Sequence, residues 1–431
     1  MKTKLILTAT LVFISLHAFA QGGWTVCNLP PITGGRVDDI FMLDTQTGYA
    51  VCGLYILKTT DGGNNWFTVN SDTAQCRSVE FINAQKGFVG AFNATPPFFN
   101  RVLRKTLDGG ASWTDLTMQI DPRARGGICG LAIPDSNTIY GCGNYYQDSA
   151  YIVKSIDGGN TWSFIDMHTY ATHLIDMYFL NKDTGFATGT GLPPLRTAVI
   201  LYTTDGGQTW VYKFQNTIAT EWCWKIQHLT DQIYFASIQD ATIVPPQILK
   251  STDGGMNWNV QIVDTAYHNI QGVGFIDSLK GWTGGGINIS FASNDGGLTW
   301  DTMNICPAMN RVFKVNDTLL FATGWQIWKY SSASTGITPA VGEVPQYASL
   351  NCNPNPASKS LTMEVTLSKA THALIVLLDE TGRRIKLIDN TDKPKGVYQY
   401  QLNTDKLSKG IYYVVLKTHE DQQTVKVVVS H

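Results

Sequence analysis

The sequence predicts an all-β protein built from seven similar units, and three observations support this. The segment LKTTDGGNNW at residues 57–66 returns five more times in nearly the same letters. A second segment, which consists of an alternating strand, a short turn and a Gly-rich strand, occurs seven times. The six aspartates of the first segment lie 47, 49, 48, 48 and 42 residues apart, a period typical of one four-stranded propeller blade. We therefore expect a seven-bladed β-propeller followed by a small antiparallel β-sandwich.

The first segment reads as an apolar strand, Ser or Thr, one residue, Asp-Gly-Gly, two residues and Trp. Its other copies are RKTLDGGASW at 104–113, VKSIDGGNTW at 153–162, LYTTDGGQTW at 201–210, LKSTDGGMNW at 249–258 and FASNDGGLTW at 291–300. Two adjacent glycines allow positive backbone dihedrals, and an aspartate can accept hydrogen bonds from the turn amides. We therefore expect structural roles for Asp61, Trp66, Asp108, Trp113, Asp157, Trp162, Asp205, Trp210, Asp253, Trp258, Asp295 and Trp300.

These six aspartates are poor candidates for catalysis. They stand at blade spacing, so they lie on different blades and no two of them can close on one scissile bond.

The seventh unit lacks its own Asp-Gly-Gly segment. At residues 325–336 the chain reads WQIWKYSSASTG, without the turn glycines and the following Trp. Residues 21–26, QGGWTV, look like the tail of a repeat copy. We expect this N-terminal strand to complete the last blade and close the ring, which removes exposed strand edges. The propeller then spans residues 21–331.

The N-terminal residues 1–20 have the features of a secretory signal peptide. Two lysines precede an apolar run that is too short for a membrane anchor, and Ala18-Phe19-Ala20 precedes Gln21. We expect cleavage between Ala20 and Gln21. No later stretch is long and apolar enough to form a transmembrane segment.

The charges and motifs exclude several classes of function. The 32 basic residues against 34 acidic residues create no field that would attract nucleic acid. No Gly-x-Ser-x-Gly, His-Glu-x-x-His or CxxC motif occurs, so we expect no metal and no cofactor.

Residues 332–346 are rich in small residues, Pro and Gly, which is typical of a linker. Residues 347–431 then contain several short alternating strands, which predict the antiparallel β-sandwich.

The pattern Ser/Thr-x-Asp-x-Gly-x-x-Trp resembles the Asp-box of the bacterial-neuraminidase-repeat families. Together with the second segment, it is similar to the photosystem II assembly-factor group of propellers, over about 310 residues. The partner-binding arginine patch of that group cannot be matched here, so its photosynthetic role is not implied. The chain also departs from the sialidases, because Gly35-Arg36-Val37 stands where they have Arg-Ile-Pro, and from the xyloglucanases, which have two propellers.

The last domain resembles the C-terminal sorting domain of the type IX secretion system in Bacteroidetes. The resemblance rests on Asn353-Pro354-Asn355-Pro356-Ala357, on DETGRRI and on the segment LSKGIY at 407–412. It implies that the type IX machinery is a partner and that the protein is secreted or held at the outer-membrane surface. The alternative is an ordinary carbohydrate-binding sandwich.

A ligand site is expected on one side of the ring. The hairpin turns and the Asp-Gly-Gly turns are short and lie on the same side, so the longer connections lie on the opposite side, where propellers usually bind ligands. Residues just before the inner strands should surround the mouth of the channel there: Arg36, Arg77, Arg125, His173, Trp222, Trp224, His268 and Arg311. The arginines could hold a carboxylate or sulfate, or each could pair with a neighbouring acid or carbonyl. The Asp38-Asp39 pair is interpreted as polar hairpin surface.

Eight cysteines are present, and Cys129 and Cys142 stand symmetrically about the turn at Asp135-Ser136. This symmetry predicts a cross-strand disulfide.

The functional expectation is an exported, non-catalytic binding or adhesion protein with a glycan or peptide ligand. The alternative is a secreted glycoside hydrolase, sialidase-like or of another Asp-box type.

Overall fold

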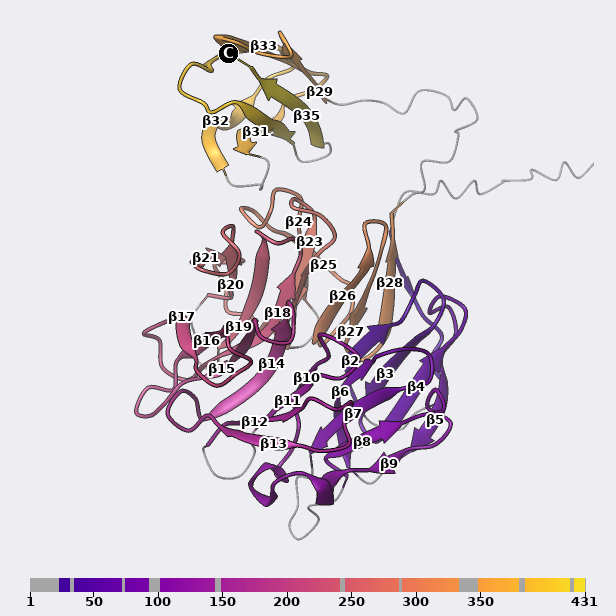
Figure 1. The fold of residues 1–431 in the computed structure, drawn as a ribbon. Coiled ribbons are helices and arrows are strands. Elements are labelled where there is room, and N and C mark those ends of the chain that lie inside the picture. Colours follow the sequence, from indigo (N-terminus) through magenta and orange to yellow (C-terminus); the bar gives the residue numbers. More distant parts are fainter. Residues whose placement is uncertain are drawn as a thin grey trace, which may run out of the picture.

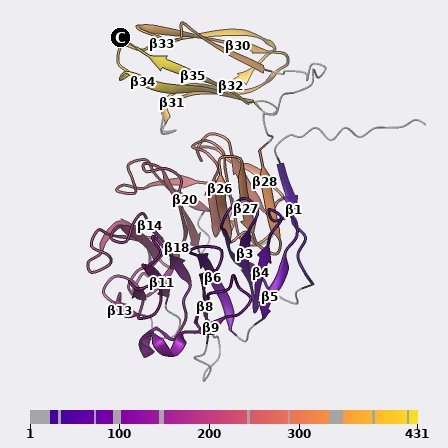
Figure 2. The same cartoon turned by 45° about the vertical axis from the view of Figure 1, so that its right-hand side comes forward.

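Seven four-stranded antiparallel sheets form a closed ring (Figures 1 and 2). The structure, a computed structural model, describes residues 23–31, 35–71, 74–92, 101–143, 149–240, 245–286, 289–332, 348–379, 384–418 and 422–430. The predicted signal peptide and, apart from residue 332, the predicted linker lie outside these residues. No helix in this part of the chain is long and apolar enough to cross a membrane.

Each blade is given from its inner to its outer strand. Blades 1 to 3 are β2 (Val37–Met42), β3 (Gly48–Cys52), β4 (Tyr55–Thr59), β5 (Phe67–Ser71); β6 (Gln75–Phe81), β7 (Gly87–Phe92), β8 (Leu103–Thr106), β9 (Thr114–Asp115); and β10 (Gly130–Ala132), β11 (Ile139–Gly143), β12 (Tyr151–Ser155), β13 (Ser163–Asp166). Blades 4 to 6 are β14 (His173–Phe179), β15 (Gly185–Thr190), β16 (Ala198–Thr203), β17 (Val211–Gln215); β18 (Glu221–His228), β19 (Tyr234–Asp240), β20 (Gln247–Ser251), β21 (Asn259–Ile262); and β22 (Gly272–Phe275), β23 (Gly281–Gly284), β24 (Ser290–Ser293), β25 (Asp301–Met303). Blade 7 is β26 (Arg311–Asn316), β27 (Leu319–Thr323), β28 (Ile327–Ser331) and β1 (Gly23–Val26). Two 3₁₀ turns, η1 (Thr117–Gln119) and η2 (Pro122–Ala124), interrupt the connection from blade 2 to blade 3.

The N-terminal strand β1 completes the seventh blade, as the sequence predicts. It pairs antiparallel with β28, with Trp24 opposite Tyr330. The Trp24 ring packs edge-on against Trp282 of blade 6 at 5.1 Å and also contacts Tyr330 at 5.5 Å. The ring is therefore closed by hydrogen bonds and by apolar burial at the same point.

The hydrophobic core lies between neighbouring blades. Three blade junctions contain a parallel ring stack between the second strand of one blade and the inner strand of the next: Tyr49 on Phe81, Tyr140 on Phe179, and Phe235 on Phe275, at 3.6 to 3.8 Å. These ring pairs are largely removed from solvent, which makes them a main source of the apolar burial that holds the blades together.

The Asp-Gly-Gly turns require both glycines. In blade 1, Gly62 and Gly63 have φ of +69° and +80°, which side chains rarely adopt. A Cβ on Gly63 would also lie 2.4 Å from the Phe321 ring of blade 7. Asp61 Oδ1 accepts a hydrogen bond from the Asn65 amide at 3.0 Å. Trp66 Nε1 donates to the Gly63 carbonyl at 3.1 Å, so one local network fixes the turn and its tryptophan.

The same turn geometry recurs in the other five copies. In each copy the aspartate accepts a hydrogen bond from the amide four residues later, at Ser112, Thr161, Thr209, Asn257 and Thr299. The hydrogen bonds from the turn lower the pKa of Asp61, Asp108 and Asp205 to about 2.

A hydrogen bond joins the two short turns of each of the first six blades. The first glycine amide donates to the carbonyl at the tip of the hairpin turn, as Gly62 does to Gln46 at 2.8 Å. The equivalent tip residues are Gln85, Asn137, Asp183, Gln232 and Leu279. This contact confirms that the short turns lie on one side of the ring, which we call the short-turn face.

The C-terminal domain is a sandwich of two sheets. One sheet is β29 (Ala348–Asn353), β30 (Ser360–Leu367) and β33 (Gly396–Asn403). The other is β32 (Arg384–Lys393), β31 (Thr371–Asp379), β34 (Gly410–Lys417) and β35 (Gln422–Val429), in that order. Residues such as Met363, Ile375 and Val414 form its core, each less than 1% exposed.

The structure contradicts the predicted disulfide between Cys129 and Cys142. All eight cysteines lie within the described residues, and no disulfide joins any two of them there. In the β10–β11 pair, Cys142 stands opposite Gly130 rather than Cys129. A register that differs by one residue turns the two side chains to opposite faces of the sheet, so symmetry about the turn was not a sufficient criterion.

Candidate ligand site at the channel mouth

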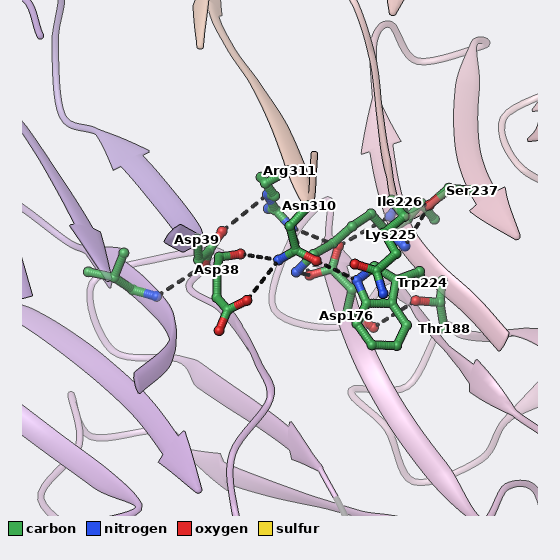
Figure 3. Close-up of polar contacts among 12 residues, drawn as sticks. Asp38, Asp39, Asp176, Thr188, Trp224, Lys225, Ile226, Ser237, Asn310 and Arg311 are labelled. Carbon is green, nitrogen blue, oxygen red and sulfur yellow. Dashed lines mark hydrogen bonds and ion pairs between the residues drawn. The ribbon is translucent and has the colours of Figure 1, made fainter. Parts of the chain in front are cut away.

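The inner strands and the residues just before them place a group of charged side chains near the centre of the ring. Figure 3 shows part of this group: Asp38, Asp39, Asp176, Lys225 and Arg311. We call this group the channel network; its members are Arg36, Asp38, Asp39, Arg77, Asp176, Lys225 and Arg311. Asp38, Asp39 and Asp176 are buried, with side chains that are 2 to 7% exposed. Buried charges require oppositely charged partners, and each of these three carboxylates has an arginine partner.

Arg311 spans the channel from blade 7. Its Nη1 atom lies 2.8 and 2.7 Å from the two carboxylate oxygens of Asp176 in blade 4, and its Nε lies 3.3 Å from Asp39 Oδ1 in blade 1. Burial pushes the pKa of Arg311 down, but the charges of Asp176 and Asp39 outweigh burial and raise it. Two carboxylates, one from blade 1 and one from blade 4, therefore share one guanidinium.

Backbone amides of the following blades hold the same two carboxylates. Asp39 Oδ2 accepts a hydrogen bond from the Val79 amide at 3.1 Å, and Asp176 Oδ2 accepts one from the Ile226 amide at 3.1 Å. Lys225 Nζ lies 3.8 Å from Asp176 Oδ1. Burial raises the pKa of the Asp39 carboxyl, while Arg311 opposes the rise. Arg311 and one backbone amide each therefore hold these two acids in place.

Arg36 and Arg77 share a third carboxylate, that of Asp38. Arg36 Nη2 lies 2.7 Å from Asp38 Oδ1, and Arg77 Nη1 lies 3.1 Å from Asp38 Oδ2. Arg36 also donates to the side chain of Gln271, which precedes β22. Two guanidinium groups thus face the single carboxylate of Asp38, so this group of three side chains has a net charge of plus one.

Aromatic rings surround the Arg77 guanidinium. Its Cζ atom lies 5.4 Å from the Phe92 ring centre and 5.8 Å from the Trp224 ring centre. Trp224 is held by a hydrogen bond of 2.7 Å from its Nε1 to Asn310 Oδ1. The ring centres of Trp222 and Trp224 are 6.4 Å apart, and those of His173 and Trp222 are 4.8 Å apart. Blades 4 and 5 therefore add a line of three rings beside the arginine.

The structure brings together six of the eight residues expected at the mouth and separates two. Arg125 follows η2, and its Nη2 lies 3.4 Å from the carbonyls of Met118 and Ile120. His268 pairs with Asp264 at 3.0 Å. Neither has a described contact with the channel network. Of the two alternatives for the arginines, pairing with neighbouring acids or carbonyls describes all four.

The acidic members of the network differ from what the sequence predicts. Asp38 and Asp39, expected as polar hairpin surface, are both buried, and a register shift between Val37 and Asp39 interrupts the usual alternation of side chains there. A signal was present: Asp39 stands five residues before Asp44, and Asp176 stands five residues before Asn181, the equivalent turn residue. Acids at the same position of two inner strands point toward one central space.

No group of three or more His, Cys, Asp or Glu residues that could hold a metal ion occurs within the described ranges. Arg311 and one backbone amide each already bind Asp39 and Asp176. A further carboxyl, that of Glu80, has its pKa raised by burial and by the charge of Asp39. A general base must be free to reach the proton that it removes.

Comparison with known families identifies the C-terminal domain. Residues 351–430 match the family described as Secretion system C-terminal sorting domain. No curated protein matches the chain.

Several solved structures share the propeller fold. A structure of YCF48 bound to D1 peptide has a TM-score of 0.53 and 18% identity, and the match covers 72% of this chain and 97% of that one. YCF48 from Cyanidioschyzon merolae has a TM-score of 0.55 at 16% identity, covering 72% and 98%. The GH74 enzyme of Niastella koreensis has a TM-score of 0.55 at 13% identity, covering 94% and 79%. Identities this low show the fold alone. The chain thus combines a seven-bladed β-propeller, similar in fold to these structures, with a C-terminal type IX secretion sorting domain that directs it outside the cell or to the outer-membrane surface.

Proposed function

We propose that the chain is an exported binding module whose propeller, residues 21–331, holds an acidic ligand at the channel mouth without cleaving it. Residues 347–431 serve export. The observation that carries the proposal is the surplus positive charge of Arg36 and Arg77 over Asp38, placed beside aromatic rings. A ligand carboxylate or sulfate would balance that charge, and its apolar part would pack on the rings.

An acidic peptide is the ligand class that we favour, with an anionic glycan as the alternative. A peptide chain can present a carboxylate to Arg77 and an apolar side chain to Trp222 or Trp224 at the same time. A propeller of similar fold, YCF48, has been solved with a bound D1 peptide. That likeness supports a peptide as the ligand class, and the charge at this mouth suggests an acidic one.

Calorimetric titration with acidic peptides and with sulfated or carboxylated oligosaccharides tests the proposal. Arg77→Ala should weaken binding by about 1 to 3 kcal/mol, because a charged hydrogen bond is lost. Arg125→Ala is the matched control, since the described hydrogen bonds of Arg125 go to the Met118 and Ile120 carbonyls, and it should leave the affinity unchanged. Equal affinity of wild type and Arg77→Ala for every ligand found would contradict the proposal.

A glycoside hydrolase is the second candidate, because one guanidinium brings two carboxylates, Asp39 and Asp176, to the channel. This candidate predicts release of a chromophore from aryl glycosides, sialosides or xyloglucan fragments by the purified protein. It also predicts that Asp176→Asn abolishes turnover while the protein stays folded. The binding proposal predicts no turnover with any of these substrates.

A further inference from the structure

The outward face of the β32-β31-β34-β35 sheet in the sorting domain is apolar. Along β31 and β34 the residues that alternate with the core are Leu374, Val376, Leu378, Tyr413 and Val415. The outward face of the other sheet is polar and includes the hydrogen-bonded pair Glu364 and Gln399. An outward sheet face in water is normally polar, so an apolar one indicates a covering partner.

Blade 6 of the propeller is that cover in the structure. Leu279 and Leu298, at the tips of its two short turns, pack against Val376, Leu378 and Val415. These three side chains are 1%, 0% and 1% exposed. Figures 1 and 2 show the sandwich beside the propeller, with β31 on the side that faces it.

The two leucines are specific to blade 6. The tip of the hairpin turn, identified by its hydrogen bond to the glycine amide, is polar in blades 1 to 5 and leucine only in blade 6. The residue after Asp-Gly-Gly is Asn64, Ala111, Asn160, Gln208 and Met256 in the other copies and Leu298 here. A leucine at a turn tip buries no apolar surface unless another part of the protein covers it. The difference between blade 6 and the other blades is therefore independent support for the contact.

Polar contacts flank the apolar centre. Lys417 Nζ lies 3.1 Å from Asp301 Oδ2 and 3.2 Å from Thr299 Oγ1, both in blade 6. The turn aspartate Asp295 is 1% exposed, whereas the equivalent aspartates of the other five turns are exposed or half-buried. An apolar centre with a charged rim is the usual composition of a specific interface.

We propose that the short turns of blade 6 form a docking site for the chain's own sorting domain, and that this contact masks the apolar β31–β34 face until it is displaced. A partner that binds this face must therefore compete with Leu279 and Leu298. The channel mouth lies on the opposite side of the ring, so ligand binding there and docking of the sorting domain do not exclude each other.

Small-angle X-ray scattering of the full chain without residues 1–20 tests the docking. The variant Leu279→Asp with Leu298→Asp should shift the radius of gyration to a larger value and raise the rate of hydroxyl-radical labelling at Tyr413. The matched control Gln46→Asp with Asn64→Asp carries the same new side chains at the equivalent tips of blade 1. It should change neither quantity.

The ion pair gives a second test that does not depend on the leucines. Lys417→Asp should produce the same shift, and adding Asp301→Lys should restore the wild-type scattering curve and Tyr413 labelling. If the leucine variant scatters as wild type does, the docking proposal is wrong. If that variant does not fold, failure of the charge swap to restore the curve overturns the proposal instead. Ligand titration at the mouth should be unchanged in these variants, which separates this proposal from the proposed function.

Discussion

Replacing Arg311 with methionine should be the most damaging single change in the channel. The methionine fills similar space but leaves Asp39 and Asp176 without the guanidinium that now lies 2.7 to 3.3 Å from them. Both carboxylates are at most 7% exposed, so water cannot replace the lost partner. Breaking a buried ion pair in this way costs about 3 to 5 kcal/mol of unfolding free energy.

The loss should depend on pH with a definite sign. Burial already raises the pKa of Asp39 in the folded protein, and without Arg311 the attraction that opposes this rise is lost. The folded protein then binds more protons than the unfolded chain, so its stability falls as pH rises through that window. The deficit of Arg311→Met relative to wild type should therefore be larger at pH 8 than at pH 5. Adding Asp176→Asn should recover part of it at pH 8, because one uncompensated charge is removed.

Urea denaturation followed by tryptophan fluorescence measures this effect. The matched control is Arg123→Ala, since Arg123 forms an exposed ion pair with Asp121 and should leave the transition midpoint unchanged. A loss below about 1 kcal/mol for Arg311→Met, comparable to an exposed pair, would refute the reasoning that the channel charges are buried and mutually dependent.

Three further predictions concern the scaffold. Burial, reinforced by the charge of Asp39, raises the pKa of Glu80 from 4.5 to about 8, so between these pH values the unfolded chain loses a proton that the folded protein keeps. Wild-type stability should therefore fall as pH rises through this range, and Glu80→Gln should flatten that part of a urea-midpoint profile against pH. Asp295→Ala should lower the free energy of unfolding by about 1 to 3 kcal/mol, because the Thr299 amide and hydroxyl lose a buried acceptor. Asp108→Ala, in an exposed turn, should lower it less, and equal effects of the two variants would contradict the role of burial. Deleting residues 23–26 should expose the edge of β28 and the Trp282 ring. The thermal unfolding transition, followed by circular dichroism, should therefore shift to lower temperature, and an unchanged transition would contradict closure of the ring by β1.

The sequence alone determined the architecture, because the features that specify it are local. The Asp-Gly-Gly turn, its tryptophan and its spacing are encoded within ten residues of each copy, and counting the copies predicts seven blades and a missing outer strand. The resemblance of the last 85 residues to a sorting domain also depends only on a contiguous segment, and the family match covers 351–430.

Only the tertiary structure decided which charges meet. Arg311 and Asp176 are 135 residues apart in the chain, and the ring closure that brings them to 2.7 Å leaves no trace in local sequence patterns. The pair Cys129 and Cys142, which no disulfide joins, makes the same point at short range, because a register offset of one residue, set by packing, reverses the direction of a side chain. Leu279 and Leu298 are visible in the sequence as apolar turn tips, but their partner lies in another domain. Contacts across a ring or between domains depend on how all the blades and both domains pack together, so no single segment of the sequence determines them.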